Sequence, residues 1–324
     1  MLRLERLQLD QVDWKRLDAF DDRLVFQTRE WLEFIRRTQD AQPLVAALLD
    51  EKDEIVGYFT GLVIRRFGVR ILGSPFPGWT TSYMGFNLED GVGRREAAQA
   101  LVRFAFGPLG CLHLELKDRF LAADELADLG FEHTPNVTFE VDLEPPEDAI
   151  FGRMTSACRR AIRKSEKVGV VVEEAAGEGF ADEYYAQLEE VFAKQSLSPT
   201  YDASRVRELI DTIHPTGRLL LLRARSPDGQ GIATGIFPAL NKTAYFWGGA
   251  SWREHQIMRP NEAIFWYAMR YWKARGAQVL DMGGGGEYKR KYGPTELSVP
   301  FFRKSRVPAL GLLRELARRV KSRT

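Results

Sequence analysis

Residues 277–293, AQVLDMGGGGEYKRKYG, hold the densest group of side chains and glycines that could do chemistry. Residues 277–282 alternate and are β-prone, which predicts a short strand that ends at Asp281. Four glycines follow and allow the backbone to approach a ligand closely. An amphipathic turn then carries aromatic residues four apart and three consecutive cations, before Gly293. A strand that leads through a glycine turn into cations can present positive charge to an anionic ligand or a developing oxyanion.

Lys289 is the best single candidate in this stretch for stabilising charge on a transferring acyl group, with Tyr288 packed beside it. Two further cations flank Lys289, so we expect its pKa to be lowered, or its ammonium to be held as a charge donor near an anion. Asp281 or Glu287 could take the proton from an attacking amine. Asp281 could instead be a turn former, and the whole stretch a glycine turn beside a basic surface patch.

A second basic group lies at 153–167, RMTSACRRAIRKSEK. Arg160, Arg163, Lys164 and Lys167 fall on one face of a predicted helix, at i, i+3, i+4 and i+7. Such a run is often only a solvated face. Like charges at these spacings repel one another by about 0.2–0.5 kcal/mol per pair, so a phosphate-bearing ligand would relieve strain. In that case Arg160, Arg163 and Lys164 would hold donor or acceptor phosphates.

Residues 245–251, YFWGGAS, form an aromatic strand that opens into two glycines before a long predicted helix. They are either a core strand with its turn or part of a donor site, to which Tyr245 and Trp247 would contribute. The next segment, 252–261, has no glycine, and Pro260 has no amide hydrogen. A standard coenzyme-A cradle, in which backbone amides hold the pyrophosphate at a helix N-terminus, is therefore not expected. We assign Arg259 of this segment to substrate binding.

Composition limits the class of protein. With 324 residues the chain is long enough for two domains of about 150 residues each. A net charge of +1 excludes the global basic field of a dedicated nucleic-acid binder. Two distant cysteines and four scattered histidines favour a reducing compartment and no metal site. The N-terminus has no apolar signal region and no window reaches 18 apolar residues, so we expect a cytoplasmic protein.

The elements that must position these residues alternate between helix and strand. In the first half we predict helices at 12–20, 28–38, 93–106 and 124–129, and strands at 43–49, 55–64, 69–72, 112–116 and 137–143. In the second half we predict helices at 151–168, 180–195, 203–213 and 261–275, and strands at 170–174, 218–224, 231–238, 243–249 and 297–302, besides the strand before the glycines.

This order predicts an α+β fold with two tandem GNAT-like (N-acetyltransferase-like) domains and mixed central sheets. Pro145 and Pro146 suggest the boundary, with domains at 1–144 and 145–306. Residues 307–324 form a predicted basic amphipathic helix. That helix either packs on the protein or attaches it peripherally to the anionic inner surface of the membrane.

Several short motifs occur together in order between residues 26 and 293. They are FQTREW at 26–31, RRxIRKxxKxGV at 159–170, YFWGGAS at 245–251, DMGG at 281–284 and YKxxYG at 288–293. Together they resemble the FemABX-like (peptidoglycan bridge-forming) transferases, and equally the related acyltransferases of envelope polysaccharide synthesis.

The resemblance implies two tandem acetyltransferase-like domains with the active site in the cleft between them. It implies transfer of an aminoacyl group from aminoacyl-tRNA, or of an acyl group from another activated carrier, to an amine. The family's catalytic aromatic–lysine pair falls on Tyr288 and Lys289. Its acceptor-phosphate contacts fall on Arg36 or Arg37. At a helix end where close relatives carry a threonine and an arginine, this chain has Ala193, Lys194 and Gln195, so Lys194 could replace the arginine only as a point charge. The long helical arm that some members use with tRNA has no counterpart.

We therefore predict a transferase that acts by direct attack of an amine, without a covalent enzyme intermediate. It would bind no resident cofactor and would use aminoacyl-tRNA or acyl-CoA as co-substrate. The acceptor would be an amine of a cell-envelope precursor. The alternative is a binding protein without turnover, which recognises an envelope precursor or nucleic acid through its basic face.

Overall fold

The computed structural model describes residues 1–66, 68–194 and 196–307. The chain forms two compact units. The first consists of residues 1–136 together with the described residues from 298 onward, and the second consists of residues 137–297. The predicted C-terminal helix lies outside the described residues, apart from Val307.

The first unit is built on an eight-stranded sheet. Its strands are β1 (Arg3–Leu7), β2 (Gln42–Leu49), β3 (Ile55–Arg66), β4 (Val69–Ser74), β5 (Gly85–Leu88), β6 (His113–Leu116), β7 (Glu132–Thr134) and β16 (Phe301–Ser305). The strand order is β1-β2-β3-β4-β6-β16-β7, with β5 beside β3. The helices are α1 (Trp14–Asp18), α2 (Arg29–Thr38) and α3 (Arg94–Phe106), with short 3₁₀ turns η1 (Val25–Gln27) and η2 (Asp124–Leu129).

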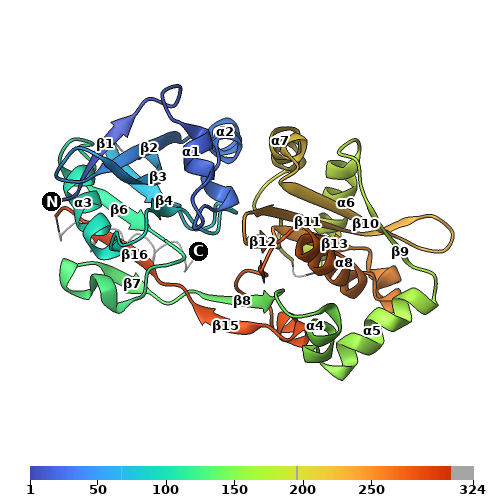
Figure 1. Cartoon of the computed structure of the whole chain (residues 1–324). Helices are drawn as coiled ribbons and strands as arrows, with labels where there is room; N and C mark the ends of the chain where they lie inside the picture. The colour runs from blue at the N-terminus through green and yellow to red at the C-terminus, as the bar shows by residue number, and fades with distance from the viewer. Residues whose placement is uncertain (67, 195, 308–324) are drawn as a thin grey trace. The chain divides into compact units, whose positions relative to one another are not determined.

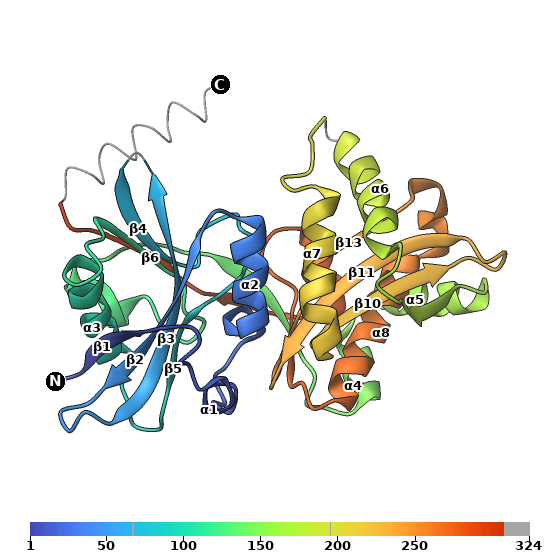
Figure 2. The ribbon, with the colours of Figure 1, turned by 90° about the horizontal axis from the view of Figure 1, so that it is seen from above.

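Helices cover both faces of this sheet, which explains why β2 is buried at almost every position. Figure 2 shows α3 on one side of the strands and α2 on the other. The hydroxyl of Thr28 caps α2 by accepting a hydrogen bond from the backbone N–H of Trp31, as its position before the apolar stripe predicts. Trp31 is fully buried behind this cap.

The second unit is built on another eight-stranded sheet. Its strands are β8 (Val137–Asp142), β9 (Val171–Glu174), β10 (Leu219–Arg225), β11 (Gly231–Leu240), β12 (Thr243–Tyr245), β13 (Gly248–Ser251), β14 (Val279–Asp281) and β15 (Thr295–Ser298). The order is β15-β8-β14-β12-β11-β10-β9, with β13 beside β11. The helices are α4 (Glu147–Arg153), α5 (Ser156–Lys167), α6 (Phe180–Ala193), α7 (Ala203–Ile213) and α8 (Pro260–Ala274), with 3₁₀ turns η3 (His214–Thr216), η4 (Arg253–Met258) and η5 (Glu287–Tyr292).

Opposite faces of the second sheet carry different helices (Figures 1 and 2). On one face, α5 and α8 contribute Cys158, Ile162, Ile264 and Phe265 to a core shared with β10 and β11. On the other face, α6 lies over β13. That second face matters for the site, because two buried polar side chains of α6, Tyr184 and Gln187, lie on it.

Both sheets are mixed, as predicted. Most neighbouring strands are antiparallel, while β4 pairs with β6 and β12 pairs with β14 in parallel. The predicted α+β class with two mixed central sheets is confirmed.

The boundary between the units differs from the one suggested by the two prolines. Strand β8 pairs with β14 of the second sheet, so the second unit begins before Pro145. Strand β16 pairs with β6 of the first sheet, so the chain returns to the first unit near its end. Pro146 is instead the N-cap of α4. A proline pair marks the end of a strand, but it does not indicate which sheet the strand joins.

The strand predicted at 297–302 is divided between β15 of the second sheet and β16 of the first. Two further predicted elements are interrupted within the second unit. The helix predicted at 151–168 is α4 and α5, separated at Met154 and Thr155, because the hydroxyl of Thr155 accepts a hydrogen bond from the N–H of Cys158 and starts a new helix. The strand predicted at 243–249 is β12 and β13, separated at Phe246 and Trp247. The second interruption creates the candidate active site.

Candidate active site

At the break between β12 and β13, the chain leaves β14, with which β12 is paired, and continues beside β11. In β12, Tyr245 lies opposite Asp281 of β14, and the N–H of Phe246 still donates to the carbonyl of Asp281, at 2.8 Å. The next N–H, of Trp247, donates to Ile236 of β11 at 3.0 Å instead. From there β13 pairs with β11, and in the described part of the chain it has no partner on its other side. The sheet is therefore open beside the glycine turn.

Asp281 organises that turn. Its side chain is buried, and Oδ1 accepts hydrogen bonds from the hydroxyl of Thr138 and, at 2.7 Å, from the N–H of Gly283. Gly283, Gly285 and Gly286 all have φ near +70°, where a side chain would be strained. These contacts match the turn-forming role that was one of the two alternatives for Asp281.

Lys289 points into this turn from η5 and is only 6% exposed. Its ammonium donates to the carbonyl oxygens of Gly284, at 2.8 Å, and of Gly283, at 3.3 Å. The ring centroids of Phe246 and Tyr288 each lie 5.9 Å from Nζ. Since an ammonium has three hydrogens and no third acceptor is recorded within the described residues, one N–H remains for a substrate oxygen.

Burial lowers the pKa of Lys289 to about 8, and the nearby Asp281 carboxylate opposes this shift. The direction is the predicted one. The cause is different, because desolvation of the charged form dominates rather than repulsion from the adjacent cations.

The two adjacent cations are engaged by carboxylates. Arg290 is half-exposed and pairs with Glu287 and Glu296, at 2.7 and 2.6 Å. Lys291 pairs with the buried Glu262 of α8, at 2.8 Å. Of the three consecutive cations, only Lys289 faces the glycine turn.

Tyr288 is half-exposed, in contrast to its neighbour Lys289. Its ring packs against the turn so closely that a Cβ on Gly286 would lie 2.6 Å from Cε1 of Tyr288. Gly286 is therefore required for this placement of the aromatic ring beside the lysine.

The two aromatic residues predicted to bind substrate occupy different environments. Tyr245 is almost fully buried within β12 and contributes to the interior. Trp247 lies in the strand break and is partly exposed, and its ring centroid is 5.3 Å from that of Tyr201.

The predicted phosphate-binding cations of α5 are exposed. The guanidinium of Arg163 lies 5.3 Å from the ring of Phe151, while Cys158 and Ile162 anchor the opposite face of the helix. Within the described residues, neither Arg160 nor Lys164 is in an ion pair. This face can accept an anion without first breaking an internal contact.

The other predicted binding residues lie at separate places. Arg36 and Arg37 belong to the first unit and share Glu33, at 2.6 Å each, which lowers the pKa of Glu33 to about 2. Arg37 also lines a cavity of about 460 Å³ between α1 and α2, together with Trp14.

In the second unit, Lys194 ends α6 and pairs with Glu190, at 2.9 Å. Arg259 is exposed and precedes α8 with a left-handed backbone, at φ 63°. Neither residue contacts Lys289 through a recorded interaction among the described residues.

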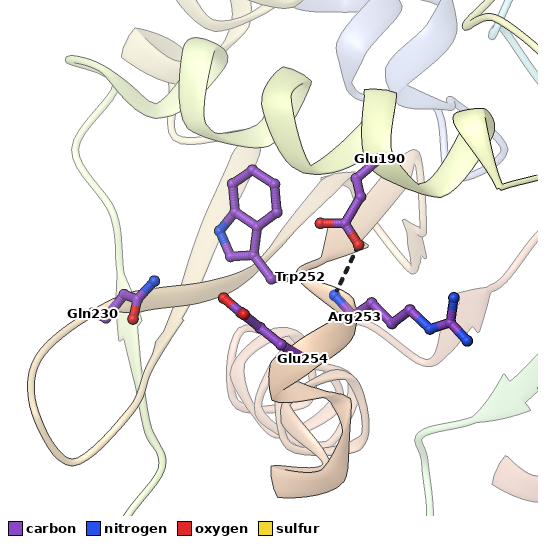
Figure 3. Close-up of a pocket in the computed structure, with 5 residues that line it drawn as sticks. All are labelled: Glu190, Gln230, Trp252, Arg253 and Glu254. Atoms are coloured by element: carbon purple, nitrogen blue, oxygen red, sulfur yellow. Dashed lines mark hydrogen bonds between the residues drawn. The ribbon is translucent and has the colours of Figure 1, made fainter.

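A pocket of about 740 Å³ in the second unit was not predicted from the sequence. It is lined by Glu190, Gln230, Trp252, Arg253 and Glu254. Figure 3 shows Trp252 pointing toward α6 and the guanidinium of Arg253 directed away from the other four side chains. The backbone N–H of Arg253 donates to Glu190, at 3.2 Å.

The carboxylates in this pocket oppose an anionic ligand there. The hydrogen bond from Lys194 lowers the pKa of Glu190, so this carboxylate is ionised at neutral pH. In the sequence, only the lack of glycine at 252–261 hinted at an unusual loop. The residues that line the pocket come from three separate segments of the chain, so no local pattern could have indicated it.

Among the described residues, no group of three histidine, cysteine, aspartate or glutamate side chains could hold a metal ion. Both cysteines are free and buried. In the same part of the chain, no helix has the length and apolar character needed to span a bilayer.

Comparisons with known proteins agree with this architecture. A family model of the acetyltransferase (GNAT) domain matches residues 152–291. The crystal structure of FemX superposes with a TM-score of 0.75 at 15% identity, covering 92% of this chain and 96% of FemX. No curated protein matches significantly by sequence.

Two further structures are similar over most of their length. A conserved protein of unknown function from Bacteroides thetaiotaomicron gives a TM-score of 0.60 at 12% identity, covering 94% of this chain and 100% of that one. The C-terminal domain of a putative lysylphosphatidylglycerol synthetase from Agrobacterium fabrum gives 0.54 at 12% identity, covering 86% and 88%. At these identities the likeness concerns the fold.

Proposed function

Because the chain has a FemABX-like fold with two tandem GNAT-like domains, we propose that it is an acyltransferase. It moves an aminoacyl or acyl group from an activated donor to an amine of a cell-envelope precursor. The observation that carries this proposal is the buried ammonium of Lys289, held by two carbonyls of a glycine turn at an open sheet edge. The names of the similar structures, FemX and a lysylphosphatidylglycerol synthetase, support the envelope-related substrate class.

In the proposed reaction, the nitrogen of the acceptor amine attacks the carbonyl carbon of the donor. The C–N bond forms, the carbonyl oxygen becomes an oxyanion, and the free N–H of Lys289 donates to it. Collapse of this intermediate breaks the bond to the carrier, and the amine proton leaves with the carrier or through a carboxylate. Asp281 and Glu287 stay candidates for that carboxylate, and Asp281 already has a structural task.

The cations Arg160, Arg163 and Lys164 are proposed to hold phosphates of the donor or acceptor. They occupy one helix face, while the opposite face is fixed in the core. Lys194, Arg259, Arg36 and Arg37 are proposed as further contacts to the same anionic substrates. Trp247 is proposed to contact substrate at the strand break.

The donor is proposed to be aminoacyl-tRNA in preference to acyl-CoA, with acyl-CoA as the alternative. At the N-terminus of α8, Pro260 supplies no N–H. The neighbouring pocket adds Glu190 and Glu254. Each of these features disfavours a pyrophosphate at this helix end.

A thermal-shift panel followed by a transfer assay tests the proposal. The probes are acetyl-CoA, a charged tRNA mixture and nucleotide-linked muropeptides. A ligand at 100 times its Kd stabilises the folded protein by about 2.7 kcal/mol, which gives a clear rise in Tm. We expect shifts with charged tRNA and muropeptide, and transfer of the labelled aminoacyl group between them.

A rise in Tm and turnover with acetyl-CoA would instead indicate that the protein is a thioester-dependent acyltransferase. Binding without transfer from any donor would favour the non-catalytic binding protein instead. The two outcomes are separated by product formation, since both include ligand binding.

The lowered pKa of Lys289 predicts the pH dependence of the reaction. Burial disfavours the charged form, so the ammonium predominates below pH 8 and is lost as the pH rises through about 8. We expect kcat/KM to fall by about tenfold per pH unit above that value. In Lys289→Arg this fall should disappear, because a guanidinium stays charged. A profile that rises through pH 8 would indicate that the neutral amine acts as a base.

A further inference from the structure

The face of the second sheet that α6 covers carries a group of buried and partly buried polar side chains, of which only Trp247 has been given a role so far. We call Tyr184, Gln187, Tyr201 and Trp247 the donor cluster. Cross-strand pairing places Gly248 opposite Ile236 and Ala250 opposite Thr234 on this face. Tyr184 and Gln187 are one helical turn apart on α6, above β13.

Gln187 has an amide that is only half satisfied. The residue is fully buried, and its Oε1 accepts a hydrogen bond from the hydroxyl of Thr234, at 2.8 Å. Its Nε2 is buried without a hydrogen-bond partner in the described part of the chain. Such a group costs about 1–3 kcal/mol in the folded state, so it needs a physical reason.

Trp247 presents a second donor of the same kind. Its Nε1 is buried and has no acceptor among the described residues. The indole packs against Tyr201, so the ring is held in place. An indole N–H is a donor only, and therefore an acceptor oxygen is its natural partner.

The two phenols add a third donor. The hydroxyl oxygens of Tyr184 and Tyr201 lie 2.7 Å apart, and one of them donates to the other. One hydroxyl hydrogen is therefore left over from the pair. Gly248 permits this arrangement, because a Cβ at that position would lie 2.4 Å from the hydroxyl of Tyr184.

One cation and one acid, Arg205 and Asp202, lie next to the cluster. The guanidinium carbon of Arg205 lies 5.9 Å from the ring centroid of Tyr201. Its nearest acid, Asp202, accepts hydrogen bonds from Ser204 and from the N-terminus of α7. Three hydrogen-bond donors suit an oxygen ligand, since an oxygen accepts hydrogen bonds whereas an ammonium only donates them.

We infer that the donor cluster is a subsite for a carbonyl or carboxylate oxygen of a peptide-like substrate, bound by Gln187 Nε2 and Trp247 Nε1. Trp247 directly follows Phe246, whose ring lies 5.9 Å from Nζ of Lys289. The two rings pack against different elements, Phe246 against Phe265 of α8 and Trp247 against Tyr201, so the subsite lies on the α6 side of the strand. The assignment of the ligand as substrate rests on the proposed function, whereas binding of the oxygen group does not.

The experiment uses the indole N–H signals of the full-length protein labelled with ¹⁵N-tryptophan. The chain has seven tryptophans, and Trp247→Phe identifies one signal by its loss. Trp272 provides a matched control, since its Nε1 is also buried without a partner among the described residues. The probes are N-acetylglycine, N-acetylglycinamide, inorganic phosphate and ethylammonium.

We expect the Trp247 signal to move downfield and to saturate with N-acetylglycine or N-acetylglycinamide, while the Trp272 signal stays in place. In Gln187→Met the same titration should be weakened about tenfold. The Tm should change little, because loss of the unsatisfied donor offsets loss of the acceptor for the buried Thr234 hydroxyl. Gln187→Glu, which keeps the acceptor for Thr234 and loses the donor, should also bind the carboxylate probe more weakly.

Three results would overturn the inference. They are no saturable movement with either acetylglycine probe, equal movement of Trp247 and Trp272, or a response confined to phosphate or ethylammonium. None of these readouts requires turnover. A failure here is therefore distinct from failure of the transfer assay, which tests the proposed function.

Discussion

Replacing Lys289 by alanine should lower kcat/KM by about 10²–10³, which is the usual cost of removing one preorganised donor to an oxyanion. The ammonium is buried and is already oriented by the carbonyls of Gly283 and Gly284, so little reorganisation is needed during the reaction. The measurement is steady-state kinetics with the donor and acceptor identified by the thermal-shift panel. Donor affinity should stay within a few-fold, because the lost interaction forms mainly in the transition state.

Arg290→Ala is the matched control for this prediction. It removes an adjacent cation of the same segment, which is half-exposed and pairs with Glu287 and Glu296 on the surface. Its activity should stay within a few-fold of the native value. Equal loss in the two variants would contradict the assignment, since the segment would then act as a general basic patch. Lys289→Met separates loss of charge from loss of packing, as it keeps most of the side-chain volume.

Lys291→Met should destabilise the protein by about 2–4 kcal/mol, because it leaves the buried carboxylate of Glu262 without its counter-ion. The pair joins η5 to α8 at 2.8 Å, and the Glu262 side chain is only 10% exposed. Urea unfolding measures the change directly. We expect the remaining folded protein to keep the native KM, since Lys291 points away from the glycine turn.

The double variant Glu262→Gln with Lys291→Met tests the physical cause. If an uncompensated charge is responsible, neutralising Glu262 should restore most of the lost stability. A double variant as unstable as Lys291→Met alone would show that the cost comes from packing. A loss below about 0.5 kcal/mol in Lys291→Met would mean that solvent screens the pair, as at an exposed site.

The glycine turn shows which features of the site can be predicted from local sequence and which cannot. The strand end at Asp281, the turn and the basic helical segment follow from residue types and spacing, and the structure has all three. The same pattern could not rank Lys289, Arg290 and Lys291, which are adjacent and chemically similar. Their partners decide the ranking, and Glu262 and Glu296 come from α8 and β15.

The domain boundary and the strand break show a second limit. Local composition indicated β8 and the final strand, but pairing across more than a hundred residues assigns them to one sheet or the other. The aromatic residues at 243–249 predict one strand, whereas β12 and β13 separate because the N–H groups of Phe246 and Trp247 bond to different neighbours.

The amino-acid sequence by itself determined the order of elements, the mixed α+β class, the cap at Thr28 and the segment that carries Lys289. These features depend on interactions within a few residues, where helix and strand periodicity, capping and turn chemistry act. Only the tertiary structure decided which cation faces the turn, where the sheet opens, and that Gln187 and Trp247 share a face. Those features depend on burial and on contacts between distant segments, which no local pattern encodes.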